Sequence, residues 1–194
     1  MRSRDALPNV PLRVAGPVTA EFMARGITSF QAAGRYLQAL PYGRTANRTD
    51  FSAVLHEGRG TCSTKHALLS TLAHEQQLPV ALTLGIYEMS EENTPGVGVV
   101  LAHYGLASLP EAHCYLTYNG ARIDVTRSGV DPTEPITRFL HEEAIVPEQI
   151  GAYKVTLHHQ YLQEWLRNNP ETLKGRGFEG IWQIREECIA ELTQ

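Results

Sequence analysis

The distribution of apolar and polar positions predicts helices at both ends of the chain and one in its centre. A proline opens the segment 17–25 and Gly26 closes it, which is typical of a short helix. Thr28 or Ser29 can cap a second helix that runs to residue 40. The segment 61–77 carries apolar side chains on more than one side, so we expect a largely buried central helix. Other helices are predicted at 50–57, 161–168 and 178–192.

Apolar runs between these helices predict strands. Residues 80–87 form a β-rich apolar run that suits an inner strand, and residues 153–158 are predicted as a further strand. The segments 88–111 and 127–151 are punctuated by glycine and proline. We expect the first to be a long loop with one helical turn that borders the site, because it leads directly into His113. The second is expected to be irregular apart from a short helix at 136–144.

The Asn119-Gly120 pair separates two alternating runs and is the strongest short signal for a β-hairpin. A symmetric two-residue turn pairs residue 118 with 121 and residue 116 with 123. One face of the hairpin is then mainly apolar, with Cys114, Leu116, Tyr118, Ala121, Ile123 and Val125. The other face is mainly polar, with His113, Tyr115, Thr117, Arg122, Asp124 and Thr126. His113 and Asp124 become diagonal neighbours with Cα atoms about 7–8 Å apart, so their side chains can meet.

Composition indicates an ordinary soluble globular protein with a single domain. The chain has 194 residues, of which 42% are hydrophobic and 20% charged. Three cysteines are an odd number, so a closed disulfide framework is not expected. Cys114 on the apolar hairpin face and Cys188 in the last helix are expected to be packing residues.

Charge and hydropathy exclude several classes of function. The formal net charge is −4 with no dense basic block, which argues against a nucleic-acid partner. The N-terminus lacks the apolar run of a signal peptide, and no run of about 18 apolar residues is present, so we expect no membrane partner. The expected location is the cytoplasm, where thiols stay reduced.

Cys62 occupies the first turn of the predicted central helix. A helix N-terminus carries partial positive charge and unpaired N–H groups, and both favour the reactive thiolate. A nucleophilic cysteine also needs a base and a group that orients the base. The hairpin supplies both in His113 and Asp124, so the three residues together suggest a Cys–His–Asp triad.

Two stretches resemble the transglutaminase-like superfamily, whose members have the papain-like fold of cysteine enzymes. They are GRGTCSTKHALLSTLAHEQQLPV at 58–80 and AHCYLTYNGARIDVT at 112–126. The resemblance implies an α+β fold in which a central Cys-bearing helix packs on a small antiparallel sheet. It also implies one domain over 1–194, with a core at 50–160 and helical N- and C-terminal extensions.

The resemblance further implies thiol-dependent acyl transfer or amide hydrolysis, as in a peptidase, amidase, deamidase or transglutaminase. Cys62 would be the nucleophile, His113 the base and Asp124 the orienting carboxylate. The expected substrate is a peptide, a protein or a small amide or thioester, and no cofactor is implied. Backbone N–H groups at the start of the Cys62 helix would bind the oxyanion. Possible further oxyanion or pocket residues are Asn47, Tyr42, His56 and His66.

Departures from the family pattern leave alternatives open. Many members have an aromatic residue where this chain has Cys114 and a Trp where it has Ile123, and no calcium-type acidic cluster is present. A scaffold without activity, which some members of this fold have become, is one alternative. Arylamine N-acetyltransferases use a similar triad on small amines. A zinc site at Cys62 and His66, with a third ligand from the hairpin, is less well supported because the spacing typical of structural zinc does not repeat. The oligomeric state has no signature in the sequence.

Overall fold

Helices form the N-terminal part of the computed structural model, which describes residues 6–127, 136, 138–173 and 175–193. The helices are α1 (Pro17–Ala24), α2 (Phe30–Ala39), α3 (Ala53–Glu57) and α4 (Cys62–Glu75). Helices α1 and α2 both contact α4. The predicted termini are confirmed, because Ser29 accepts a hydrogen bond from the backbone N–H of Ala32, and Gly26 follows α1 with a φ of 74°.

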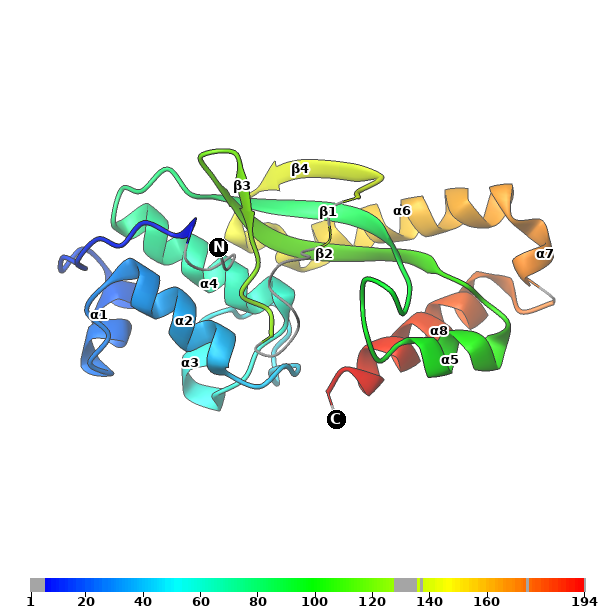
Figure 1. Ribbon diagram of the computed structural model, residues 1–194, viewed down its shortest axis with the longest axis horizontal. Coiled ribbons are helices and arrows are strands. Elements are labelled where there is room, and N and C mark those ends of the chain that lie inside the picture. The colour runs from blue at the N-terminus through cyan, green and yellow to red at the C-terminus, as the bar shows by residue number, and fades with distance from the viewer. Residues whose placement is uncertain (1–5, 128–135, 137, 174, 194) are drawn as a thin grey trace.

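A four-stranded antiparallel sheet with the order β3-β2-β1-β4 lies above α1–α4 in Figure 1. The strands are β1 (Ala81–Met89), β2 (Leu109–Tyr118), β3 (Ala121–Ile123) and β4 (His141–Ile145). The chain is therefore an α+β protein with a small antiparallel sheet, as predicted, and β1 is an inner strand.

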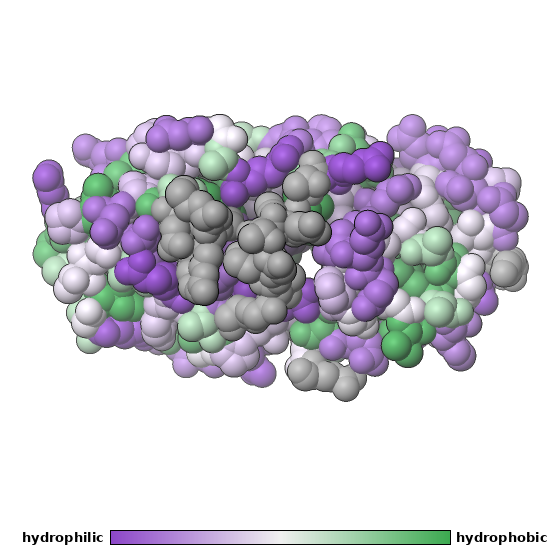
Figure 2. All heavy atoms as spheres, in the orientation of Figure 1, coloured by the Kyte–Doolittle hydropathy of each residue, from purple (hydrophilic) through white to green (hydrophobic). Residues whose placement is uncertain are grey.

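The second half of the molecule is built from helix α5 (Gly98–Tyr104) and the C-terminal elements. These are the 3₁₀ turn η2 (Pro147–Ile150) and helices α6 (Ala152–Asn168), α7 (Pro170–Leu173) and α8 (Gly177–Glu191). In Figure 1, α1–α4 lie below one end of the long strands and α5 with α8 below the other end. Each half has its own apolar cluster, which includes Leu68 and Leu69 in the first and Ile181 and Ile184 in the second. The space-filling view shows the surface hollowed between the halves (Figure 2).

The hairpin has the predicted register. Tyr118 pairs with Ala121 and Leu116 with Ile123, and both turn residues, Asn119 and Gly120, have positive φ. The β3 ladder ends at Ile123, earlier than predicted. Asp124 follows directly and its carboxylate still lies beside His113.

The predicted strand at 153–158 is wrong, because these residues form the first turns of the 17-residue helix α6. The buried positions of α6 are four residues apart, at Lys154, His158, Leu162 and Leu166. The first two are polar, whereas Val155 and Leu157 are apolar. The sequence pattern therefore suggested a strand and did not indicate which face of the helix is buried. His158 and His159 both lie within α6.

The two segments predicted as irregular contain more structure than expected. Within 88–111, β1 extends to Met89, a seven-residue helix α5 forms, and β2 begins at Leu109. Long-range pairing between β1 and β2 lengthens both strands beyond their local signals. The helix predicted at 136–144 is wrong where the chain is described, because His141–Ile145 pairs with β1 as β4. Residues 128–135 and 137 lie outside the described part of the chain. Among the described residues, none of the helices has both the length and the apolar character needed to cross a membrane.

Candidate active site

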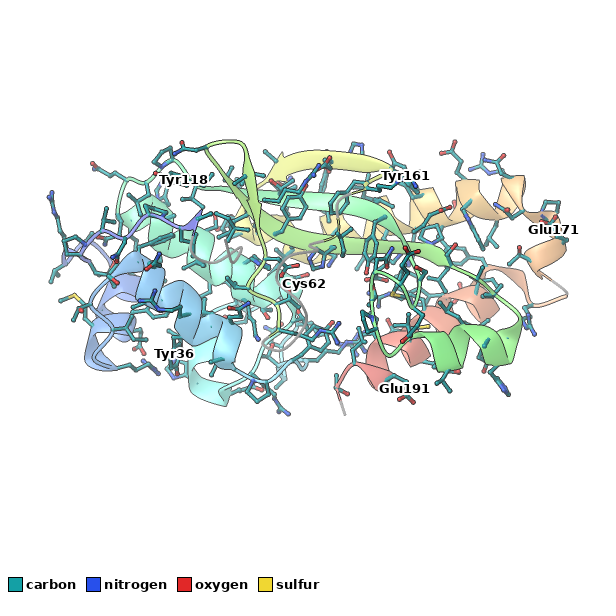
Figure 3. All side chains as sticks on the ribbon, viewed as in Figure 1. Tyr36, Cys62, Tyr118, Tyr161, Glu171 and Glu191 are labelled. Atoms are coloured by element: carbon teal, nitrogen blue, oxygen red, sulfur yellow. The ribbon has the colours of Figure 1, made fainter. Side chains whose placement is uncertain are left out.

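Cys62 is the first residue of α4 and lies near the centre of the molecule, below the sheet (Figure 3). A capping box between Thr61 and Thr64 begins the helix, which leaves the backbone N–H groups of Cys62 and Ser63 without intrahelical acceptors. The chain reaches this point through Gly60, where a Cβ atom would lie 2.9 Å from Val54 Cγ2. Glycine at this position therefore lets the helix start, and with it the thiol, lie against the neighbouring elements.

His113 and Asp124 are joined by a hydrogen bond of 2.7 Å between Nε2 and Oδ2. The backbone N–H of Thr126 donates to the other carboxylate oxygen of Asp124 at 2.8 Å. Burial opposes ionisation of Asp124, but the charge and hydrogen bond of His113, with smaller effects of other neighbours, together hold the pKa of this carboxyl well below its usual range. The bond to Nε2 leaves Nδ1 as the ring nitrogen available to the cysteine.

Cys62 and His113 shift each other toward the charged forms. Burial disfavours the thiolate, but the positive charges of Lys154 and His113, and a hydrogen bond from His113, lower the pKa of Cys62 to about 6. Burial likewise disfavours the imidazolium, but Asp124 and the Cys62 thiolate raise the pKa of His113 to about 10. The backbone N–H of Cys114 also favours the thiolate. At neutral pH the two side chains therefore form a thiolate–imidazolium pair.

Lys154 is a site residue that sequence reasoning missed. Its Nζ lies 3.7 Å from Cys62 Sγ and donates to Ser63 Oγ at 2.7 Å, and only 9% of the residue is exposed. Burial disfavours the ammonium, but the Cys62 thiolate and other nearby anions raise the pKa of Lys154 above its ordinary value. The four-residue spacing of Lys154, His158, Leu162 and Leu166 was the signal that could have predicted a buried helix face. The prediction of a strand at 153–158 is incompatible with that spacing.

His66 lies one turn beyond Cys62 and connects α4 to the residues after β3. Its Nδ1 donates to the Cys62 carbonyl at 2.7 Å, and its Nε2 accepts from the backbone N–H of Val125 at 2.8 Å. Burial lowers the pKa of His66 to about 4, so the ring is neutral at pH 7. Lys65 binds the same segment, through a bond of 2.7 Å from Nζ to the Thr126 carbonyl. These two side chains position Asp124 rather than line the cavity.

Of the other predicted oxyanion or pocket residues, one lies at the cavity and two lie at the surface. Tyr42 lines a cavity together with Cys62, and burial raises the pKa of its hydroxyl. Asn47 is exposed, and its side chain accepts hydrogen bonds from Thr49 in a local turn. His56 is exposed in the last turn of α3. The structure does not bring Asn47 and His56 to the site, because both are in surface segments before α4.

A cavity of about 310 Å³ opens beside Cys62 on the side of Lys154. It is lined by the loop after α2, the start of α4, strand β2, the start of α6 and one face of α8. Residues from both halves of the molecule therefore meet at the thiol. The 88–111 segment contributes to this cavity through Glu111 rather than through a loop.

One wall of the cavity is a network of buried and half-buried ion pairs. Arg185 Nε donates to Glu111 Oε2 at 2.6 Å, and its guanidinium also binds Glu186, which in turn pairs with Arg44. Burial disfavours ionisation of Glu111, but the charge of Arg185 lowers its pKa to about 2. His158 is held by a bond of 2.8 Å from Nε2 to the Pro110 carbonyl, and burial lowers its pKa. The network connects α8 to β2 and thereby shapes the far side of the cavity.

The remaining cysteines differ from Cys62 in their surroundings. Cys114 and Cys188 are buried, and burial raises the pKa of each thiol to about 11. Both ring nitrogens of His66 are already bonded within the protein, which argues against its use as a zinc ligand. Searched over the described residues alone, the chain has no group of three or more His, Cys, Asp or Glu side chains that could hold a metal ion.

Comparisons with protein-family models, with curated proteins and with solved structures find no match to this chain.

Proposed function

We propose that the protein catalyses thiol-dependent acyl transfer or amide hydrolysis through Cys62, His113 and Asp124. The observation that carries the proposal is the charged chain of these three side chains at a helix N-terminus beside a cavity. A buried cysteine with only a packing role would have a raised pKa, as Cys114 and Cys188 do. Cys62 instead has a lowered pKa, which is typical of a nucleophile.

In the first step the Cys62 thiolate attacks the carbonyl carbon of an amide or thioester. The new S–C bond forms as the carbonyl π electrons move to oxygen, which becomes an oxyanion. The His113 imidazolium then gives its Nδ1 proton to the leaving amine or thiol as the old bond breaks. The product is a thioester between Cys62 and the acyl group.

In the second step His113, now neutral, accepts a proton from water or from an acceptor amine. The resulting nucleophile attacks the thioester, and the Cys62 thiolate leaves. Water yields a carboxylic acid, and an amine yields a new amide. Asp124 holds Nε2 throughout, which keeps Nδ1 directed toward the thiol and stabilises the imidazolium.

Three sets of donors support the oxyanion in this scheme. The backbone N–H groups of Cys62 and Ser63 lie at the positive end of α4. The backbone N–H of Cys114 favours the negative charge on the Cys62 sulfur. Lys154 adds a full positive charge 3.7 Å from that sulfur. As negative charge moves from sulfur to the adjacent oxygen, the ammonium stays within reach of it.

We further propose that the fold is of the papain-like, transglutaminase-like type. In support, the cysteine begins a buried helix that packs on the sheet, and the histidine and aspartate come from β2 and from the residue after β3. These are the positions that the sequence resemblance implies for such an enzyme.

The test is alkylation of the intact protein by iodoacetamide across pH, with the modified residue located by mass spectrometry. We expect Cys62 to react with a midpoint near pH 6, and His113→Ala to raise that midpoint. Cys188→Ser is the matched control and should leave the profile unchanged. Incubation with an aryl thioester should place the acyl group on Cys62 and not on the protein with Cys62→Ser.

A midpoint for Cys62 near that of a free thiol, about pH 8.5, would refute the catalytic proposal and favour a binding scaffold. Acylation of the Cys62→Ser protein at the rate of the unmodified protein would refute it as well.

A further inference from the structure

We infer that the cavity beside Cys62 selects small acyl donors that carry a negatively charged group. The inference rests on the proposed function, because it concerns which acyl group reaches Cys62. It is carried by the charges that line the cavity, by the burial of Lys154 and by the place of Arg48 at the cavity wall.

The charged side chains of the cavity are predominantly positive. In the described lining there are four cationic side chains and two carboxylates, namely Arg44, Arg48, Lys154 and Arg185 against Glu111 and Glu186. The two carboxylates are already neutralised within the protein by Arg185 and Arg44. Two positive charges therefore remain, those of Lys154 and Arg48.

The Cys62 thiolate is the anion that acts most strongly on Lys154. Its Nζ lies 3.7 Å from Sγ, and its other bond is to the neutral hydroxyl of Ser63. Acylation converts the thiolate into an uncharged thioester, which leaves the buried ammonium without its main counter-ion, because Glu111 is already paired with Arg185. Such a charge is costly unless another anion approaches. An anionic group on the acyl donor would supply that anion.

Arg48 is the second unneutralised cation. It is an exposed residue of the loop after α2 that also lines the cavity. Across the described ranges its guanidinium has no ion pair, whereas the neighbouring Arg44 is bound to Glu186 at 2.8 Å. It can therefore attract an incoming anion at the cavity mouth. Hydroxyl groups of Thr45, Thr49 and Thr61 line the same space and can accept or donate hydrogen bonds there.

The volume of about 310 Å³ suits a small acyl group rather than a folded protein segment. We therefore expect the preferred donor to be a small amide or thioester with a negatively charged substituent on its acyl side.

The test compares two alkylating reagents of nearly equal size, iodoacetate and iodoacetamide, which differ in charge. Both react with the same thiolate, so the ratio of their rates cancels any change in the thiolate fraction. Relative to the ratio for glutathione, we expect the ratio of iodoacetate to iodoacetamide at Cys62 to be about tenfold higher or more. Because His113 also carries positive charge, the decisive measurement is made on variants of the cavity.

We expect Arg48→Ala and Lys154→Met each to lower the ratio by about threefold or more. Salt at about 0.5 M shortens the electrostatic screening length to roughly 4 Å, so we expect it to reduce the effect of Arg48 on the ratio. Arg35→Ala, an exposed arginine of α2 outside the cavity, is the matched control and should leave the ratio unchanged. A ratio equal to that of glutathione, or one unaffected by Arg48→Ala and Lys154→Met, would overturn this inference while leaving the nucleophile in place. Loss of selective reaction at Cys62 with both reagents would instead overturn the proposed function.

Discussion

The ammonium of Lys154 lies 3.7 Å from the sulfur of Cys62, although 92 positions separate the two residues in the chain. The contact gives the thiolate a second cation in addition to His113. Among the lowering effects on the pKa of Cys62, the charge of Lys154 is the largest.

Replacing Lys154 by Met should therefore raise the pH at which Cys62 becomes reactive. The variant loses the positive charge that lowers this pKa most, so we expect the alkylation midpoint to rise by about one to two pH units. Lys154→Arg retains the charge and should keep the midpoint closer to that of the unmodified protein. The measurement is the pH profile of iodoacetamide labelling, with Tyr153→Phe as a control on the exposed side of α6. An unchanged midpoint in the Lys154→Met protein would contradict the electrostatic role.

Asp124→Asn should lower the pKa of His113 while leaving the fold intact. The folded-state pKa of His113 is raised from 6.5 to about 10, and Asp124 is the largest cause that raises it. The protonated His113 therefore stabilises the folded protein below pH 6.5, and this contribution is lost as the pH rises through about 10. An NMR titration of the imidazole should show the pKa falling toward 6.5 in the variant.

The same substitution should reduce acyl transfer by about 10³- to 10⁴-fold, because the imidazole loses its orienting partner. Asp50→Asn is the matched control, since Asp50 is an exposed residue that accepts local hydrogen bonds from Ser52. Equal losses of activity in both variants would argue against a specific role for Asp124.

Glu111 should contribute to stability at neutral pH and lose that contribution in acid. Its pKa is lowered from 4.5 to about 2, so its stabilisation is present above pH 4.5 and is lost as the pH falls through about 2. We expect Glu111→Gln to cost about 3 kcal/mol at pH 7 and to flatten the fall in stability over that acid range. Urea unfolding at several pH values measures both effects.

Glu57 provides the comparison for Glu111, because its ion pair with Arg59 lies at the surface. Glu57→Gln should cost less than about 1 kcal/mol. If the two substitutions cost the same, the buried Glu111–Arg185 pair does not have the structural role inferred for it.

His66→Leu should destabilise the protein by about 2 kcal/mol, because the buried N–H of Val125 loses its acceptor. The pKa of His66 is lowered from 6.5 to about 4, so its stabilisation is complete above pH 6.5 and is lost as the pH falls toward 4. Thermal unfolding over this range should show a weaker pH dependence in the variant. His56→Leu alters an exposed histidine and should change the stability little. An effect of similar size at both positions would contradict the bridging role of His66.

Local signals in the sequence predicted the parts of the site that depend on neighbouring residues. The Asn119-Gly120 turn determines the hairpin register, and the register places His113 and Asp124 on the same face. Ser29 begins α2 and Thr61 begins α4 through hydrogen bonds within a few residues of each helix start. Such short-range contacts are encoded directly in the order of the residues.

The sequence by itself thus determined the start of the central helix, the hairpin and the candidate nucleophile with its two partners. Only the tertiary structure decided that residues 153–158 are helical, that Lys154 lies beside Cys62 and that Arg48 borders the same cavity. The physical reason is that α6 buries polar side chains, whose partners come from distant elements. Burial of a lysine becomes favourable only when its ammonium contacts groups such as the Cys62 thiolate and the Ser63 hydroxyl of α4. These contacts form between distant parts of the chain, so no local sequence pattern predicts them.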